Sequence, residues 1–256
     1  MASLFFAAGL GAVAGLLPVY LGLVPLWFMR RIPESWRSLI VSISLGILLF
    51  LFVDVTGEGV RLAGSPGLNS LLFVVGLSLG VFAPLAAARR GRVDAVAIVD
   101  QEGVAGEREK ARFFTAYMIA VGLGMHNLGE GLAIGAAYSA GELALTSVLV
   151  VGFALHNATE GFGIAAPVAS LPLRIRQPLA MGFLAGFPTI LGSMLGFVAY
   201  SQAIGSLFFS VAGGALLYVI FQLVRLAYVA SRTERTLLGV VLGMILMYLT
   251  GILVST

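Results

Sequence analysis

The chain has 256 residues, of which 59% are hydrophobic and only 11% are charged, and its formal net charge is +3. A water-soluble protein of this length carries about one quarter charged residues, so the composition excludes a soluble globular domain and indicates a membrane protein. The chain contains no cysteine, which excludes disulfides and thiolate metal ligands.

Apolar runs long enough to cross a bilayer, about 20 residues each, recur along the whole chain. They predict an all-α polytopic membrane protein with eight transmembrane helices, forming a single transmembrane domain over residues 1–256 with one longer cytoplasmic loop at about 89–112. The first run has no basic residue before it and is too long for a signal-peptide core, so it predicts a retained helix. The predicted spans are 4–28, 38–57, 69–88, 113–138, 143–168, 178–200, 204–229 and 236–254.

The basic residues lie almost entirely on one side of these spans. Three follow the first span, six separate the third from the fourth, two follow the fifth, and three surround the connection between the seventh and eighth; only Arg61 falls on the other side. Because Lys and Arg concentrate in cytoplasmic loops, both termini are predicted to be extracytoplasmic. We expect a multi-pass protein of the cell (inner) membrane, surrounded by the lipid bilayer, with no nucleic-acid partner.

Prolines within two of the predicted spans indicate where helices bend. Pro18 and Pro25 lie in the first span and Pro188 lies in the sixth. Proline removes a backbone donor and clashes with the preceding turn, so kinks are predicted at these places.

One motif occurs twice, in the fourth and fifth spans. The segments 121–137 (VGLGMHNLGEGLAIGAA) and 151–167 (VGFALHNATEGFGIAAP) share the pattern V-G-x-x-x-H-N-x-x-E-G-x-x-I-x-A, and they contain the only two histidines of the chain. Polar side chains are costly in hydrocarbon, and carboxylates especially so. A duplicated set of His, Asn and Glu at membrane depth therefore indicates a functional site.

The spacing of the motif indicates metal binding. Residues four apart are neighbours on one helix face, so His126 pairs with Glu130, and His156 pairs with Glu160. The two spans are antiparallel neighbours, and both motifs lie about twelve residues from a helix start, near the bilayer midplane. Imidazole nitrogen and carboxylate oxygen suit Zn²⁺, Fe²⁺ or Mn²⁺. The alternative, that the polar residues only hydrogen-bond neighbouring helices, does not account for the carboxylate four residues after each histidine.

The two motifs and the predicted spans resemble the ZIP (Zrt/Irt-like protein) family of divalent metal transporters, whose fourth and fifth helices carry H-N-x-P-E-G-type motifs. The resemblance implies uptake of metal toward the cytoplasm, a homodimer, and a bundle of helices one, four, five and six that moves against helices two, three, seven and eight. It also implies that the metal is held by the motif positions His126, Asn127, Glu130, His156, Asn157 and Glu160.

The chain departs from the family pattern near the expected site. Gly129 and Thr159 stand where the family has proline before the motif glutamate. In the sixth span, Thr189 aligns with a position where the family commonly has a metal-binding glutamate, and we expect its hydroxyl to orient a bound water or donate to a ligand carboxylate. Two carboxylates balance one divalent cation, so one ion per protomer is predicted.

Two further acids, Asp54 and Glu58, lie toward the outer end of the second span. They are interpreted either as a solvated helix end or as an entrance that attracts cations.

These observations predict a transporter of divalent transition metal, with Zn²⁺ favoured over Fe²⁺, Mn²⁺ or Cd²⁺ and the ion acting as substrate. Alternating access is the expected mechanism, although sequence does not separate a carrier from a channel. The alternative from another class is a membrane-embedded metalloenzyme that uses the same site. The chain has no H-E-x-x-H motif and no nucleophile beyond the proposed ligands, which disfavours the enzyme.

Overall fold

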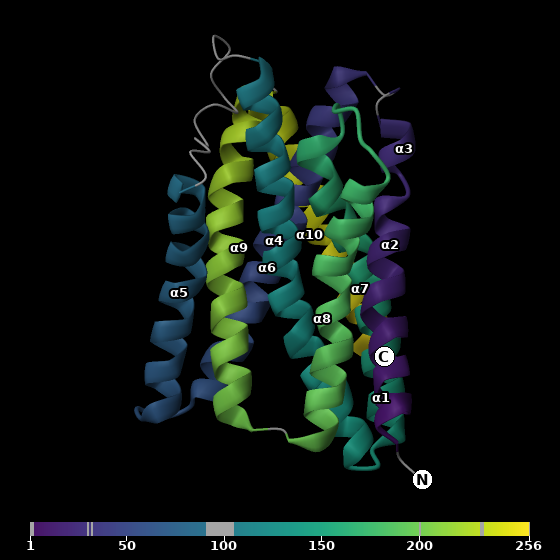
Figure 1. Ribbon diagram of the computed structural model, residues 1–256, viewed down its shortest axis with the longest axis vertical. Helices are drawn as coiled ribbons and strands as arrows, with labels where there is room; N and C mark the ends of the chain where they lie inside the picture. Colours follow the sequence, from purple (N-terminus) through teal and green to yellow (C-terminus); the bar gives the residue numbers. More distant parts are fainter. Residues whose placement is uncertain are drawn as a thin grey trace.

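The computed structural model describes residues 3–29, 31, 33–90, 105–199, 201–230 and 233–255. Every regular element within these ranges is helical, and the helices run roughly side by side along the long axis of the molecule (Figure 1). The N-terminal end of α1, the turn between α6 and α7 and the start of α9 lie at one end of this bundle, whereas the connection between α7 and α8 lies at the other.

The first predicted span consists of consecutive short elements. They are α1 (Leu4–Gly11), the π-helical η1 (Ala12–Leu16), α2 (Leu17–Leu23) and α3 (Leu26–Met29). Pro18 lies in the first turn of α2, directly after η1, and the chain turns at Val24 and Pro25 before α3. These four elements together are called helix one. It changes from π-helical to α-helical turns just before Pro18 and is interrupted at Pro25, whereas α8 continues through Pro188.

Each of the other predicted spans is covered by one helix. These helices are α4 (Glu34–Ala63), α5 (Leu68–Arg90), α6 (Ala105–Ser139), α7 (Leu143–Val168), α8 (Arg176–Val198), α9 (Gln202–Ala230) and α10 (Thr233–Ser255).

Among the described residues, seven helical segments are long and apolar enough to cross a membrane. They are the run from Leu4 to Met29 and parts or all of α4, α5, α7, α8, α9 and α10. Helix α6 is not among them. It carries His126, Asn127 and Glu130 in its interior and charged residues in its first turns, which lower its hydropathy.

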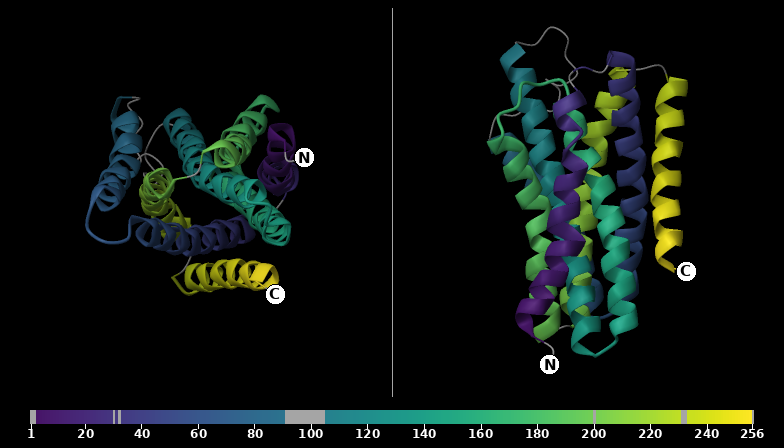
Figure 2. Two further views of the ribbon diagram at one scale, coloured as in Figure 1. Left: turned by 90° about the horizontal axis from the view of Figure 1, so that it is seen from below. Right: turned by 90° about the vertical axis from the view of Figure 1, so that its right-hand side faces the viewer.

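The helices form two groups, each held together by close contacts between helix backbones. Helix one, α6, α7 and α8 form the first group, and α4, α5, α9 and α10 form the second (Figure 2). Within the first group, Gly192 of α8 lies directly against the backbone of Leu128 in α6. Within the second group, Gly214 of α9 lies against the backbone of Leu77 in α5. Small residues let helix backbones approach closely, and both groups use them.

The contacts between the two groups are made mainly by side chains. Gly163 of α7 faces the side chain of Leu48 in α4. Gly122 of α6 faces the methyl group of Ala215 in α9, and the backbone of α9 lies slightly further away, at 3.7 Å. Fully buried Leu51, Leu123 and Leu216 belong to the same continuous core. Side-chain surfaces can slide or repack more readily than touching backbones, so the boundary between the groups is the more deformable interface.

We predict that Gly192→Ala destabilises the protein because the added methyl group meets the Leu128 carbonyl of α6. Overpacking of this kind destabilises by about 1–3 kcal/mol, which should lower the midpoint of thermal unfolding in detergent. The matched control is Gly9→Ala in α1, where nothing lies within 4 Å of the added carbon. An equal midpoint for the two variants would contradict this account of the packing.

Candidate metal centre

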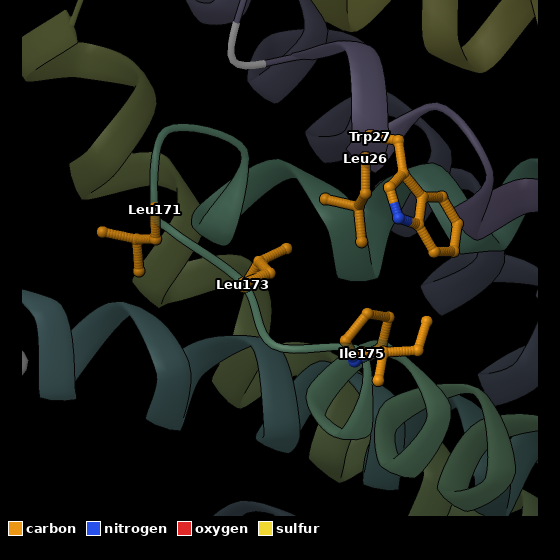
Figure 3. Close-up of a pocket in the computed structure, with 6 residues that line it drawn as sticks. Leu26, Trp27, Leu171, Leu173 and Ile175 are labelled. Carbon is orange, nitrogen blue, oxygen red and sulfur yellow. The ribbon is translucent and has the colours of Figure 1, made fainter.

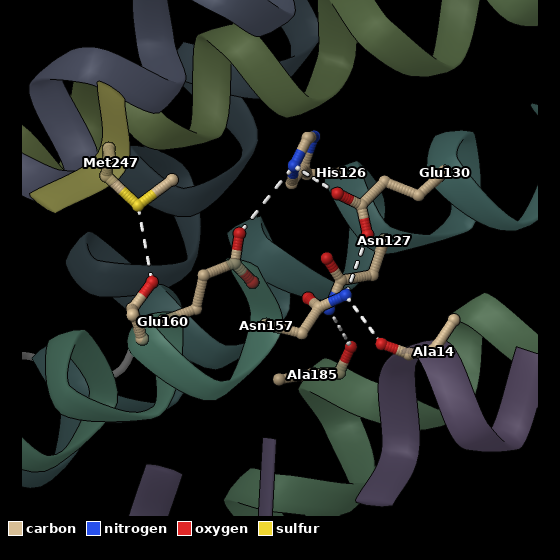
Figure 4. A network of polar contacts seen from close by, with 9 residues as sticks. Ala14, His126, Asn127, Glu130, Asn157, Glu160, Ala185 and Met247 are labelled. Atoms are coloured by element: carbon tan, nitrogen blue, oxygen red, sulfur yellow. Dashed lines mark hydrogen bonds and ion pairs between the residues drawn. The ribbon is translucent and has the colours of Figure 1, made fainter. Parts of the chain in front are cut away.

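Helices α6 and α7 bring polar residues of the two motif copies together in the interior of the bundle (Figure 4). The exposed fraction of His126 is 3%, that of Glu130 is 2%, and that of Glu160 is 0%. The side chain of His156 lies outside the described part of the structure, so its predicted place beside Glu160 remains a prediction.

The imidazole of His126 lies between the two motif carboxylates. Its Nε2 is 3.2 Å from Oε1 of Glu130 on the same helix and 3.6 Å from Oε1 of Glu160 on α7. The sequence predicted the first of these contacts from the four-residue spacing, and the second requires α6 and α7 to be neighbours. One histidine thus joins the acidic groups of both motif copies.

Asn157 connects the second carboxylate oxygen of Glu130 to helix one. Its Nδ2 donates a hydrogen bond of 2.8 Å to Oε2 of Glu130 and another of 3.0 Å to the carbonyl oxygen of Ala14. Ala14 lies in η1, and π-helical turns of this kind occur often at functional sites because they change the backbone ladder. The amide therefore ties α6, α7 and helix one together.

Asn127 makes a corresponding contact with a different helix. Its Nδ2 donates to the carbonyl oxygen of Ala185 in α8, at 3.0 Å. The Oδ1 atoms of Asn127 and Asn157 are buried and have no hydrogen-bond partner among the residues that the structure describes. Amide oxygens are acceptors and metal ligands, so both side chains present an oxygen within the polar interior.

Thr189 is fully buried in α8 and packs against helix one. Its side chain occupies the space where Gly15 lacks a Cβ, and its backbone carbonyl lies against Gly131, the residue after Glu130. The hydroxyl has no hydrogen-bond partner within the described residues. Thr189 thus lies beside the residue that follows Glu130, and its expected role toward a bound water or a ligand carboxylate remains a prediction.

The two other acids singled out by the sequence have different surroundings. Asp54 is exposed in α4. Glu58, one turn further along α4, forms an ion pair of 2.5 Å with Arg61. The three-residue spacing of Glu58 and Arg61 on one helix is the sequence signal for this ion pair.

The described residues contain no group of three or more His, Cys, Asp or Glu side chains arranged around one ion. His126 instead contacts both carboxylates directly. A separate cavity of about 130 Å³ lies near α3 and the connection from α7 to α8 (Figure 3). Only apolar residues line it, among them Leu26, Trp27 and Leu173, so it offers no side-chain ligand for a metal ion.

Two contacts around the motifs could not be read from the sequence. The carbonyl of Ala14 takes part through its backbone, which leaves no signature in a side-chain pattern. Thr159, at the position where proline was expected from the resemblance, donates from its hydroxyl to Sδ of Met247 in α10, at 3.3 Å (Figure 4). A hydroxyl at this position thus links α7 to the second helix group.

The fold and this polar interior define a helical membrane protein with buried acidic and imidazole groups between its helices. A comparison with family models then identifies the class more closely, because the model of the ZIP zinc transporter family matches residues 89–251. The chain belongs to this family. Its members are transporters, so the metalloenzyme alternative is set aside. A comparison with curated proteins finds no match.

We predict that Asn157→Ala destabilises the protein, because it leaves the Ala14 carbonyl and one carboxylate oxygen of Glu130 without this donor. Loss of a buried partner costs about 1–3 kcal/mol, measurable as a lower unfolding midpoint in metal-free detergent solution. Asn157→Asp should cost more, since it also places a carboxylate beside Glu130. Asn69→Ala, at the start of α5, is the control, and equal midpoints for all three variants would contradict the assigned network.

Proposed function

We propose that the chain carries a divalent transition-metal ion across the membrane through the cluster of His126, Glu130 and Glu160. Membership of the ZIP zinc transporter family supports transport of zinc or a related divalent metal. The observation that carries the choice of site is the burial of two carboxylates around one imidazole. Two buried negative charges need a compensating cation, which a divalent ion supplies in full.

The separations within the cluster support this role. Ligand atoms about 2.1 Å from a tetrahedral ion lie about 3.4 Å from each other. The distances of 3.2 and 3.6 Å from Nε2 of His126 to the two carboxylates bracket this value. An ion bound between these side chains would replace their mutual contacts.

The remaining motif residues complete the proposed ligand set. Asn127 and Asn157 each offer an amide oxygen, and His156 offers a second imidazole by its position in the motif. We assign Thr189 the orientation of a bound water or a ligand carboxylate. The mixture of nitrogen and oxygen favours Zn²⁺, with Fe²⁺, Mn²⁺ and Cd²⁺ as further substrates.

Eight membrane crossings are part of the proposal. Helix α6 crosses as the eighth span because α7, α8 and α9 surround its polar residues and remove them from lipid. The positive-inside rule then places the end of the bundle with Arg90 and Lys110 in the cytoplasm and the end with Glu58 and Glu142 outside. Asp54 and Glu58 lie on the outer half of α4, where they attract cations toward the path.

Alternating access follows from the division into two groups. The proposed ligands all lie on α6 and α7, within the first group, and backbone contacts hold this group together. The second group meets it mainly through side chains, so the first group can move with its ion. Uptake toward the cytoplasm, location in the cell membrane and formation of a homodimer remain predictions from the resemblance and the charge distribution.

We predict that Glu130→Ala and Glu160→Ala each abolish metal uptake into proteoliposomes of purified protein. Each change deletes an anionic charge where screening by water is weak. Uptake is measured for Zn²⁺, Fe²⁺, Mn²⁺, Cd²⁺ and, as a comparison, Mg²⁺. His126→Ala should weaken binding and shift the preference among metals, and binding should fall at low pH because protons compete for imidazole and carboxylate.

Glu142→Ala is the matched control, because it removes an exposed carboxylate at the turn between α6 and α7. It should transport as the unsubstituted protein does. Correctly folded Glu130→Ala and Glu160→Ala proteins that still transport at the unsubstituted rate would remove the proposed site.

We also predict one tightly held ion per protomer. A second divalent ion would leave about two uncompensated positive charges in a low-dielectric interior, and Thr189 cannot supply the missing carboxylate. Anomalous diffraction above and below the metal absorption edge should give one strong peak that contacts Glu130 and Glu160. Two peaks of comparable occupancy between α6 and α7 would contradict the single ion.

A further inference from the structure

The side chain of Phe209 in α9 extends from one glycine to another on two different helices. A Cβ on Gly59 of α4 would lie 3.5 Å from Cβ of Phe209, at the base of the side chain. A Cβ on Gly129 of α6 would lie 2.9 Å from Cζ, at the tip of the ring. The ring therefore occupies the space that any side chain at position 129 would need.

Gly129 places this ring beside the candidate metal centre. It directly precedes Glu130 and lies three residues after His126, which puts it next to His126 on the surface of the helix. At 1.5 Å per residue, the ring contact lies about 4.5 Å further along α6 than His126.

The direction of α9 also places Phe209 on the outer side of His126, at nearly the same depth in the bundle. Gly122 of α6 faces Ala215, and Gly129 faces Phe209, so α9 runs antiparallel to α6. Phe209 lies seven residues from the start of α9, on the side of His126 that faces the predicted outer end. Gly59, at the base of its side chain, directly follows the proposed entrance residue Glu58.

We propose that Phe209 is the outer gate of the metal path. Its ring, seated on Gly129, closes the route between the outer end of the bundle and the cluster of His126, Glu130 and Glu160. A phenyl ring offers no ligand to a cation, and an apolar constriction excludes the water that a hydrated ion would keep. This inference rests on the proposed function and on the predicted orientation in the membrane.

The gate lies across the boundary between the two helix groups. Phe209 and Gly59 belong to the second group, and Gly129 belongs to the first. A displacement of the first group removes Gly129 from beneath the ring without any change in the rotamer of Phe209. Alanine at position 129 would place its Cβ 2.9 Å from Cζ of Phe209, so the ring would have to shift from this position.

The test uses a single reporter cysteine in this otherwise cysteine-free chain. Ala212→Cys places it one turn further along α9, on the inner side of Phe209, at a position that is fully buried. Intact cells are treated with a membrane-impermeant, positively charged methanethiosulfonate reagent, and the labelling rate is measured. Adding Phe209→Ala should raise this rate at least about tenfold, the factor that corresponds to about 1.4 kcal/mol.

Phe221→Ala is the matched control. Phe221 lies on the same helix, but its exposed fraction is 68%, so removal of its ring should leave the labelling rate unchanged. Equal rates with and without Phe209→Ala, or the same increase with Phe221→Ala, would overturn the gate.

Gly129→Ala provides a second test, because it leaves Phe209 unchanged but its added methyl group displaces the phenyl ring. It should also increase labelling, and combining it with Phe209→Leu should give less than the product of the two separate effects, because both act on one contact. Independent effects would overturn the seat on Gly129. This variant also decides the matter if Phe209→Ala does not fold.

Two further measurements test separately the two assumptions of this proposal, the membrane orientation and the transport function. Glu142→Cys should be labelled rapidly on intact cells, and labelling only after permeabilisation would overturn the orientation and, with it, an outer gate. Glu130→Ala and Glu160→Ala could still take up metal at the unsubstituted rate while Phe209→Ala increases labelling of Ala212→Cys. The proposed function would then be wrong, but Phe209 would still be a barrier. If flux behaves as proposed and labelling does not change, the gate alone fails.

Discussion

Two buried carboxylates, those of Glu130 and Glu160, impose the constraint on which the surrounding structure depends. A carboxylate in a membrane interior is tolerated only beside a cation, a proton or hydrogen-bond donors. His126 approaches both, and Asn157 donates to Glu130. Helix α6 consequently needs protein on the faces that carry these groups, and α7, α8 and α9 provide it. Helix α6, the least apolar of the long helices, is therefore among those most enclosed by other helices. Facing lipid, its polar residues would lack such partners.

The same constraint decides which helices must remain together. Asn127 bonds the backbone of α8, and Asn157 bonds the backbone of helix one, so the polar residues of the motifs hold four helices in one group. Glycines add direct backbone contacts within that group. Within the described residues, the second group contacts the motif segments through side chains such as Met247, which meets Thr159, and Phe209, which meets Gly129. A cluster that belongs wholly to one group would keep its geometry in the relative movement that we propose for the two groups.

The sequence predicted the positions of the helices because the length of an apolar run is set by the bilayer. It also predicted the contact of His126 with Glu130, because a helix fixes the positions of residues four apart. Contacts between different helices could not be predicted from the sequence. The Ala14 carbonyl has no side chain to mark it, and Phe209 is one of 17 phenylalanines with no local pattern to distinguish it. Their positions depend on which helices become neighbours, information that one sequence does not carry.

The repeat that is symmetric in sequence is not symmetric in structure, and the asparagines show why. Both amide hydrogens of Asn157 are used, one by Ala14 and one by Glu130, so its oxygen is the only polar atom left to meet an ion. The corresponding bond of Asn127 goes to α8 instead. The asparagines of the two motif copies bond different helices, and the bond to the π-helical turn of helix one comes from the second copy. Asn157 is therefore held at both donors, which would lower the entropy that its oxygen loses in the ion binding that we propose.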